Sequence, residues 1–167
     1  MKKPEIAILM GSDSDLPIMQ ACLDTLSKFK VKYESHVMSA HRTPRAVSTF
    51  AAKARKRGIK VIIAGAGGAA HLAGVIAAHT TLPIIGIPLA SSDLKGLDAL
   101  LSTVQMPSGI PVATVAIGKA GATNGALLAL QILSLSDKKV EKALDEFKRE
   151  LVSKVEDKNR KLRGKAR

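Results

Sequence analysis

Hydrophobic residues in the first 30 positions follow two patterns in succession. Residues 5–10 form a short, almost unbroken apolar run, as expected for a parallel strand that is covered on both faces. A polar turn at 11–15 follows, and Pro17 suits the first turn of a helix. Apolar residues then recur at helical spacing, at Met19, Cys22, Leu23, Leu26 and Phe29. The pattern predicts one strand–helix unit.

The same unit recurs along the chain. Residues 32–38 alternate like a half-buried strand, and the helix after the next turn ends at Gly58. Further strands are predicted at 61–64, 84–87 and 112–117, and further helices at 72–79, 97–104 and 124–135. Short connections force the crossover helices onto the sheet faces, so five such strands predict a three-layer α/β/α fold. We expect a doubly wound parallel sheet of flavodoxin-like order.

The last part of the chain has a different character. Its 167 residues fit one domain, which we expect to span 1–157 with an extra C-terminal helix, followed by a basic tail at 158–167. That helix is highly charged and needs a surface for its narrow apolar stripe, either on its own domain or on a neighbouring subunit. The stripe consists of Val140, Leu144, Phe147, Leu151 and Val155.

Composition limits the possible partners. The formal net charge is +12, but the acid-free tail supplies six basic residues and leaves +6 for residues 1–157. Aromatic residues make up only 2% of the chain and no nucleic-acid-binding motif is present, so we predict no nucleic-acid partner. Excess positive charge also attracts small anionic substrates.

Other classes of protein are disfavoured as well. No apolar run approaches the ~20 residues of a membrane span, and the chain begins without a signal-peptide pattern, so we expect no membrane partner and a cytoplasmic location. The single cysteine, Cys22, is interpreted as a core residue and is compatible with a reducing compartment. Four histidines and one cysteine have no metal-ligand spacing, which predicts no metal.

The turn at 39–44, Ser-Ala-His-Arg-Thr-Pro, is the strongest candidate for chemistry. Thr43 and Pro44 suit the N-cap and first turn of a helix, which places His41 at the carboxyl end of a strand. Such turns line the ligand crevice of open α/β sheets, and histidine transfers protons near neutral pH. The alternative is that Ser39 and Thr43 only cap the helix and that His41 is a surface residue.

The first turn and Arg42 offer anion recognition. Ser12, Ser14 and the backbone amides around them can hold a phosphate at a helix N-terminus. Asp15 would be repelled by a phosphate, so it either accepts hydrogen bonds from sugar hydroxyls or caps the helix. Arg42 either forms a fork of two hydrogen bonds to phosphate or makes a surface salt bridge.

Glycines at 65–70 formally fit a dinucleotide-binding fingerprint. That fingerprint belongs in the first strand–helix unit, and no acid lies about twenty residues onward, so the context argues against a dinucleotide. We interpret the glycines, Gly67 among them, as allowing backbone to approach a planar ligand or a carboxylate. His71 is either a ligand contact or a buried histidine with a satisfied hydrogen bond.

Three of these turns and the loop at 105–111 occur together in a known order. Over roughly residues 5–135 the chain resembles the N5-carboxyaminoimidazole ribonucleotide mutases of purine biosynthesis, bacterial class I of the phosphoribosylaminoimidazole carboxylase family. One departure is Ala73, where that family commonly has proline. Loss of the proline should loosen the start of the helix, but it removes no group that binds a ligand.

The resemblance implies a flavodoxin-like enzyme that assembles as a homo-octamer with active sites at subunit junctions and no cofactor. It implies an isomerase in which the substrate carbamate loses carbon dioxide and the trapped carbon dioxide is added to the ring carbon. His41 would move the protons, and Gly67 and His71 would flank the migrating carboxylate. The ribose phosphate would be held by Ser12, Ser14, Asp15, Ser39 and Arg42.

Two alternative functions remain at this stage. A carboxylase that adds carbon dioxide directly to aminoimidazole ribonucleotide could use the same residue types. A non-catalytic nucleotide-binding protein is suggested by the basic tail and the glycines, but the sequence disfavours it because a pure binder gives no reason for His41 to lie among phosphate-binding groups.

Overall fold

The computed structural model describes residues 3–165, and its centre is a five-stranded parallel sheet. The strands stand in the order β2-β1-β3-β4-β5, which confirms the flavodoxin-like, doubly wound fold. They are β1 (Ile6–Met10), β2 (Tyr33–Val37), β3 (Val61–Gly67), β4 (Ile84–Leu89) and β5 (Ala113–Thr114).

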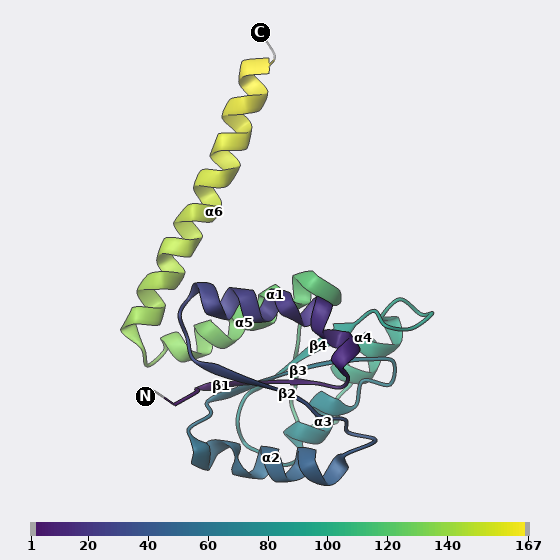
Figure 1. The fold of residues 1–167 in the computed structure, drawn as a ribbon. Helices are drawn as coiled ribbons and strands as arrows, with labels where there is room; N and C mark the ends of the chain where they lie inside the picture. Colours follow the sequence, from purple (N-terminus) through teal and green to yellow (C-terminus); the bar gives the residue numbers. More distant parts are fainter. Residues whose placement is uncertain (1–2, 166–167) are drawn as a thin grey trace. The chain divides into compact units, whose positions relative to one another are not determined.

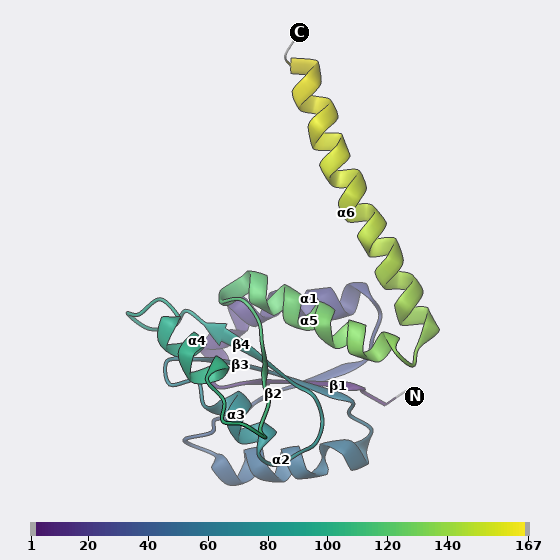
Figure 2. The same ribbon diagram turned by 180° about the vertical axis from the view of Figure 1, so that it is seen from behind.

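Helices cover both faces of this sheet. Figures 1 and 2 show α1 (Leu16–Lys28) and α5 (Gly118–Ser134) over one face and α2 (Pro44–Arg57) and α3 (Leu72–Ala77) over the other. The short helices η1 (Asp13–Asp15) and α4 (Leu97–Val104) complete this part of the chain, and α6 (Lys138–Lys165) follows. The three layers therefore match the prediction.

Burial follows the position of each strand in the sheet. All residues of β1 and β4 are buried, as expected for central strands with helices on both faces, whereas β2 at the edge is half-exposed. Small residues bring the layers close together. A Cβ on Gly65 would lie 2.4 Å from the sulfur of Met19 in α1, and one on Gly86 would lie 2.4 Å from Thr103 in α4.

Several predicted element boundaries were wrong. β3 extends three residues past 64, through Gly67, because this segment continues to pair with β4 as far as Leu89. β5 has only two residues instead of six, since it is an edge strand that pairs on one side. The helix predicted at 124 begins at Gly118, in a segment of glycine and alanine without the apolar spacing that reveals a helix.

The chain forms two compact units, Met1–Ala129 and Leu130–Arg167. The first holds the sheet, and the second holds the end of α5 and all of α6. Val140 of the predicted stripe is buried, but Leu151 and Val155 are 41% and 57% exposed. α6 continues through the basic segment as far as Lys165, so the predicted tail is helical over its described part. The domain ending at residue 157 stays a prediction.

None of the helices within residues 3–165 has the length and apolar character that a membrane span requires.

For the chemistry, the decisive feature of the fold is the sheet order. β2, β1, β3 and β4 are neighbours and run in parallel, so the segments after Val37, Met10, Gly67 and Leu89 all start at the same sheet edge.

Candidate active site

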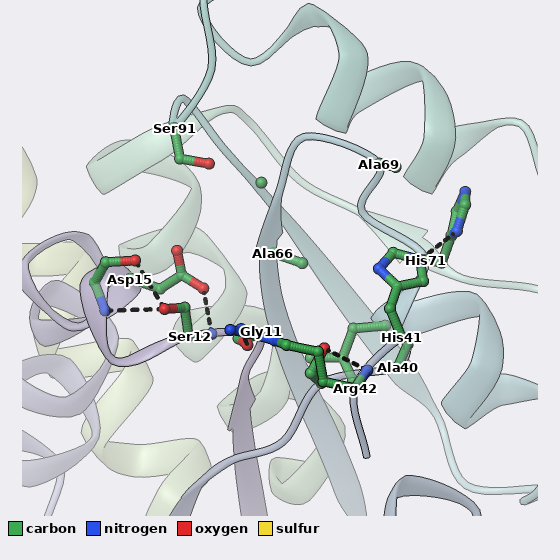
Figure 3. A pocket seen from close by; sticks show the side chains of 14 residues that line it. Gly11, Ser12, Asp15, Ala40, His41, Arg42, Ala66, Ala69, His71 and Ser91 are labelled. Carbon is green, nitrogen blue, oxygen red and sulfur yellow. Dashed lines mark hydrogen bonds between the residues drawn. The ribbon is translucent and has the colours of Figure 1, made fainter. Parts of the chain in front are cut away.

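A cavity of about 490 Å³ lies at this carboxyl edge of the sheet. Figure 3 shows how side chains from four strand ends surround it. All eight residues that the sequence singled out line the cavity: Ser12, Ser14, Asp15, Ser39, His41, Arg42, Gly67 and His71. Six further residues complete the lining: Gly11, Ala40, Ala66, Ala69, Leu72 and Ser91.

The first turn is closed by its own polar side chains. Ser12 is the N-cap of η1, and the backbone N–H of Ser12 donates to Oδ2 of Asp15 at 2.9 Å. The hydroxyl of Ser14 donates to that of Ser12 at 2.9 Å. Asp15 therefore closes the first turn and also lines the cavity, but its side chain makes no capping hydrogen bond to α1, so the helix cap weighed from sequence is not formed.

Burial sets the electrostatics of Asp15. The residue is only 5% exposed, and this burial raises the pKa of its carboxyl group above the ordinary value of 3.8. The hydrogen bond from Ser12 and the positive charge of Arg42 act in the opposite direction but are smaller effects. The cavity thus holds a partly desolvated acid beside two serine hydroxyls.

The second turn holds His41 and Arg42 at the cavity. Thr43 is the N-cap of α2 and Pro44 its first residue, as predicted. The Thr43 hydroxyl makes no bond into α2. It donates to the carbonyl of Ser39 at 3.1 Å and accepts from the N–H of Ser39 at 3.0 Å. The hydroxyl of Ser39 accepts from the N–H of Arg42, which fixes the turn further.

Arg42 connects the second turn to the first. Its Nη2 donates to the carbonyl oxygen of Gly11 at 3.0 Å. Among the side chains of residues 3–163, it forms no salt bridge with a carboxylate, so the salt bridge weighed from sequence is not made there. A guanidinium has five N–H donors, and most of those of Arg42 stay available to an anion in the cavity.

His41 and His71 form a pair of hydrogen-bonded imidazoles. Nε2 of His41 lies 2.8 Å from Nδ1 of His71, and the ring planes are 82° apart. One nitrogen must donate and the other accept, so the tautomers of the two rings are linked. His71 is exposed at the cavity, so the interpretation as a buried histidine was wrong.

Gly67 gives the third segment its shape. It is the last residue of β3, and a Cβ at this position would lie 1.6 Å from the hydroxyl oxygen of Ser91. Only a residue without a side chain therefore allows this close packing at position 67. The positive φ, of 59°, belongs to the next residue, Gly68. Gly65 and Gly67 are strand residues, so they do not form the glycine-rich turn of a dinucleotide fingerprint.

The sequence reasoning missed Ser91. It follows β4 at the same sheet edge as the other turns, and that position is the signal that could have found it.

Within the described part of the chain, no three His, Cys, Asp or Glu side chains gather where they could hold a metal ion. The absence of a metal cofactor stays a prediction.

Comparison with known proteins places this site in context. A family model described as AIR carboxylase matches residues 5–154. The chain is 58% identical over 144 residues to the N5-carboxyaminoimidazole ribonucleotide mutase of Bacillus subtilis, covering 86% of this chain and 89% of that protein. It is 54% identical over 161 residues to the mutase of the same name from Pyrococcus horikoshii, covering 96% and 90%. Among solved structures, Treponema denticola PurE superposes with a TM-score of 0.86 at 30% identity, covering 96% of this chain and 99% of that one.

Proposed function

The chain belongs to the AIR carboxylase family, and we propose that this purine-biosynthesis enzyme converts N5-carboxyaminoimidazole ribonucleotide to 4-carboxyaminoimidazole ribonucleotide. Relatives that cover most of its length at 54% and 58% identity are named as mutases of this substrate. One observation carries the proposal to this chain. The imidazole of His41 faces the same cavity as the guanidinium of Arg42 and the side chains of four serines.

Anion and sugar recognition are assigned to the first two turns. Ser12 and Ser14 exchange the hydroxyl bonds that they make within the turn for bonds to the ribose phosphate, Ser39 donates a further one, and Arg42 adds a charged fork. Asp15 has the chemistry for the ribose hydroxyls, because a carboxylate accepts hydrogen bonds and would repel the phosphate. The bond from Arg42 to Gly11 holds these two turns together before the substrate arrives.

The reaction moves one carboxyl group and one proton. The bond between the exocyclic nitrogen and the carboxyl carbon breaks, and its electron pair stays on nitrogen, which gains a proton. The ring carbon then attacks the trapped carbon dioxide and afterwards loses its own proton. His41 carries the proton between the ring carbon and the nitrogen, while Gly67 and His71 flank the migrating carboxylate.

The family name keeps direct carboxylation as the rival reaction. Supplying each imidazole substrate separately and following the carboxylated product distinguishes the two. We expect N5-carboxyaminoimidazole ribonucleotide to be converted without added bicarbonate. Faster turnover from aminoimidazole ribonucleotide plus bicarbonate would overturn the mutase assignment and leave a carboxylase.

We also propose that the enzyme works as a homo-octamer in the cytoplasm with a small ribonucleotide as its ligand. The apolar side chains of α6 support the assembly, because Leu151 and Val155 are exposed in the single chain. So does α4, where Leu97, Leu101 and Val104 are each about half exposed. Such surfaces are stabilised when a neighbouring subunit covers them.

A further inference from the structure

Ser91 lies at the cavity and has no assigned role. It belongs to the loop between β4 and α4, and its side chain lines the cavity together with the first three turns. Figure 3 shows it on the other side of the cavity from His41 and His71, with its hydroxyl oxygen exposed to the open space. No group among residues 3–163 makes a hydrogen bond to this hydroxyl.

The hydroxyl occupies the space that the missing side chain of Gly67 leaves. A Cβ on Gly67 would lie 1.6 Å from the Ser91 oxygen and 2.8 Å from its Cβ. The Ser91 hydroxyl therefore lies directly against Gly67, the residue that flanks the migrating carboxylate in the proposed function. A carboxylate at Gly67 would be within reach of a donor that no protein group uses.

The loop holds Ser91 without using its hydroxyl. The N–H of Ser91 donates to the carbonyl of Leu89 at 3.0 Å. The next residue, Ser92, donates its hydroxyl to Oδ2 of Asp98 at 2.6 Å, and this bond lowers the pKa of the Asp98 carboxyl group. Asp98 therefore stays ionised and fixes the loop to the start of α4. The two adjacent serines therefore differ in role: the Ser92 hydroxyl bonds within the loop, and the Ser91 hydroxyl faces the cavity.

We propose that Ser91 contacts the substrate and donates a hydrogen bond to the carboxyl group that leaves the nitrogen and joins the ring carbon. This inference rests on the proposed function. The donor would hold the carboxylate on the Gly67 side before the nitrogen–carbon bond breaks and again after the carbon–carbon bond forms. Carbon dioxide is then released in place, and the ring carbon attacks it before it diffuses away.

Ser91→Ala tests this by two measurements on the full-length enzyme with N5-carboxyaminoimidazole ribonucleotide. We expect turnover to fall by about 10- to 100-fold, the effect of one lost hydrogen bond to a charged group. We also expect a larger share of the consumed substrate to appear as aminoimidazole ribonucleotide and free carbon dioxide, because carbon dioxide escapes before it is captured. This partition would not change if Ser91 only shaped the loop.

Ser92→Ala is the matched control, since it removes a hydroxyl that is bound to Asp98 instead of facing the cavity. It should lower the melting temperature and leave the partition as in the wild type. If Ser91→Ala keeps both the wild-type rate and the wild-type partition, the inference is wrong. It is equally wrong if Ser91→Ala loses thermal stability as Ser92→Ala does while the partition stays unchanged.

Failure of the proposed function would look different, because the wild type itself would not convert the carbamate. If the wild type instead carboxylates aminoimidazole ribonucleotide with bicarbonate, the same two variants are compared in that reaction. A rate for Ser91→Ala equal to that of the wild type would overturn the role of Ser91 there too.

Discussion

Replacing Arg42 by alanine should weaken ligand binding much more than it disturbs the fold. Among the side chains and backbone of residues 3–163, the guanidinium makes one hydrogen bond, to the Gly11 carbonyl at 3.0 Å, and Arg42 is exposed. Its loss should cost about 0.5–1.5 kcal/mol of the free energy of unfolding, or roughly 2–5 °C in melting temperature for a chain of this size. Two charge-assisted bonds to the substrate phosphate are worth about 1.5–3 kcal/mol each, so the dissociation constant should rise about 100-fold or more.

Isothermal titration with 4-carboxyaminoimidazole ribonucleotide and thermal melting in the same buffer measure both quantities. Arg45→Ala is the matched control, because Arg45 is another exposed arginine of the same segment that does not line the cavity. Its dissociation constant should stay close to that of the wild type. If Arg42→Ala binds as tightly as the wild type but has a collapsed melting temperature, Arg42 is structural and the phosphate assignment is wrong.

Three further outcomes are expected. His41→Asn cannot titrate and should lower turnover by about 10²–10⁴-fold with little change in binding, whereas near wild-type turnover combined with an inactive His71→Asn would mean that the wrong histidine was assigned. Burial raises the pKa of Asp15, so the stability that comes from its protonated form is present below pH 3.8 and is lost as the pH rises through the folded-state pKa. Asp15→Asn should therefore melt at or above the wild-type temperature at pH 7, lose that advantage in acid and bind the ribonucleotide more weakly; a large loss of stability at pH 7 would contradict this. Light scattering should show an oligomer, and a monomer at micromolar concentration would exclude sites shared between subunits.

Much of the fold could be predicted because a strand that is buried on both faces of the sheet has a simple, mostly apolar sequence. Strands β1 and β4 are buried throughout, and each appears as a short apolar run. The boundaries that failed lie where residues are small. Gly65 and Gly67 belong to β3 although they resemble a turn, and α5 begins among glycine and alanine residues that carry no helical periodicity.

That the candidate residues line one cavity could be predicted for a topological reason. Parallel strands that are neighbours in a sheet bring their carboxyl ends together, so polar turns far apart in sequence meet at one edge. This argument selects segments, and it works for Ser12, His41 and Gly67 because each segment already carried a chemical signal. Ser91 carried none, since a serine after a strand is common and only its position against Gly67 makes it notable.

What the sequence could not supply is the set of contacts between segments. His41 and His71 are 30 residues apart, and no periodicity relates them, yet their nitrogens lie 2.8 Å apart. The glycines of β3 also depend on contacts with other segments. From their own segment alone, they would be interpreted as residues of a flexible turn. Gly65 lies where Met19 of α1 packs, and Gly67 lies where Ser91 packs, so both are glycine because a neighbour from another segment occupies the space of a side chain. A dinucleotide-binding turn and a tightly packed strand end can therefore have the same glycine pattern in sequence. Only the residues that lie next to the glycines in the folded protein distinguish the two.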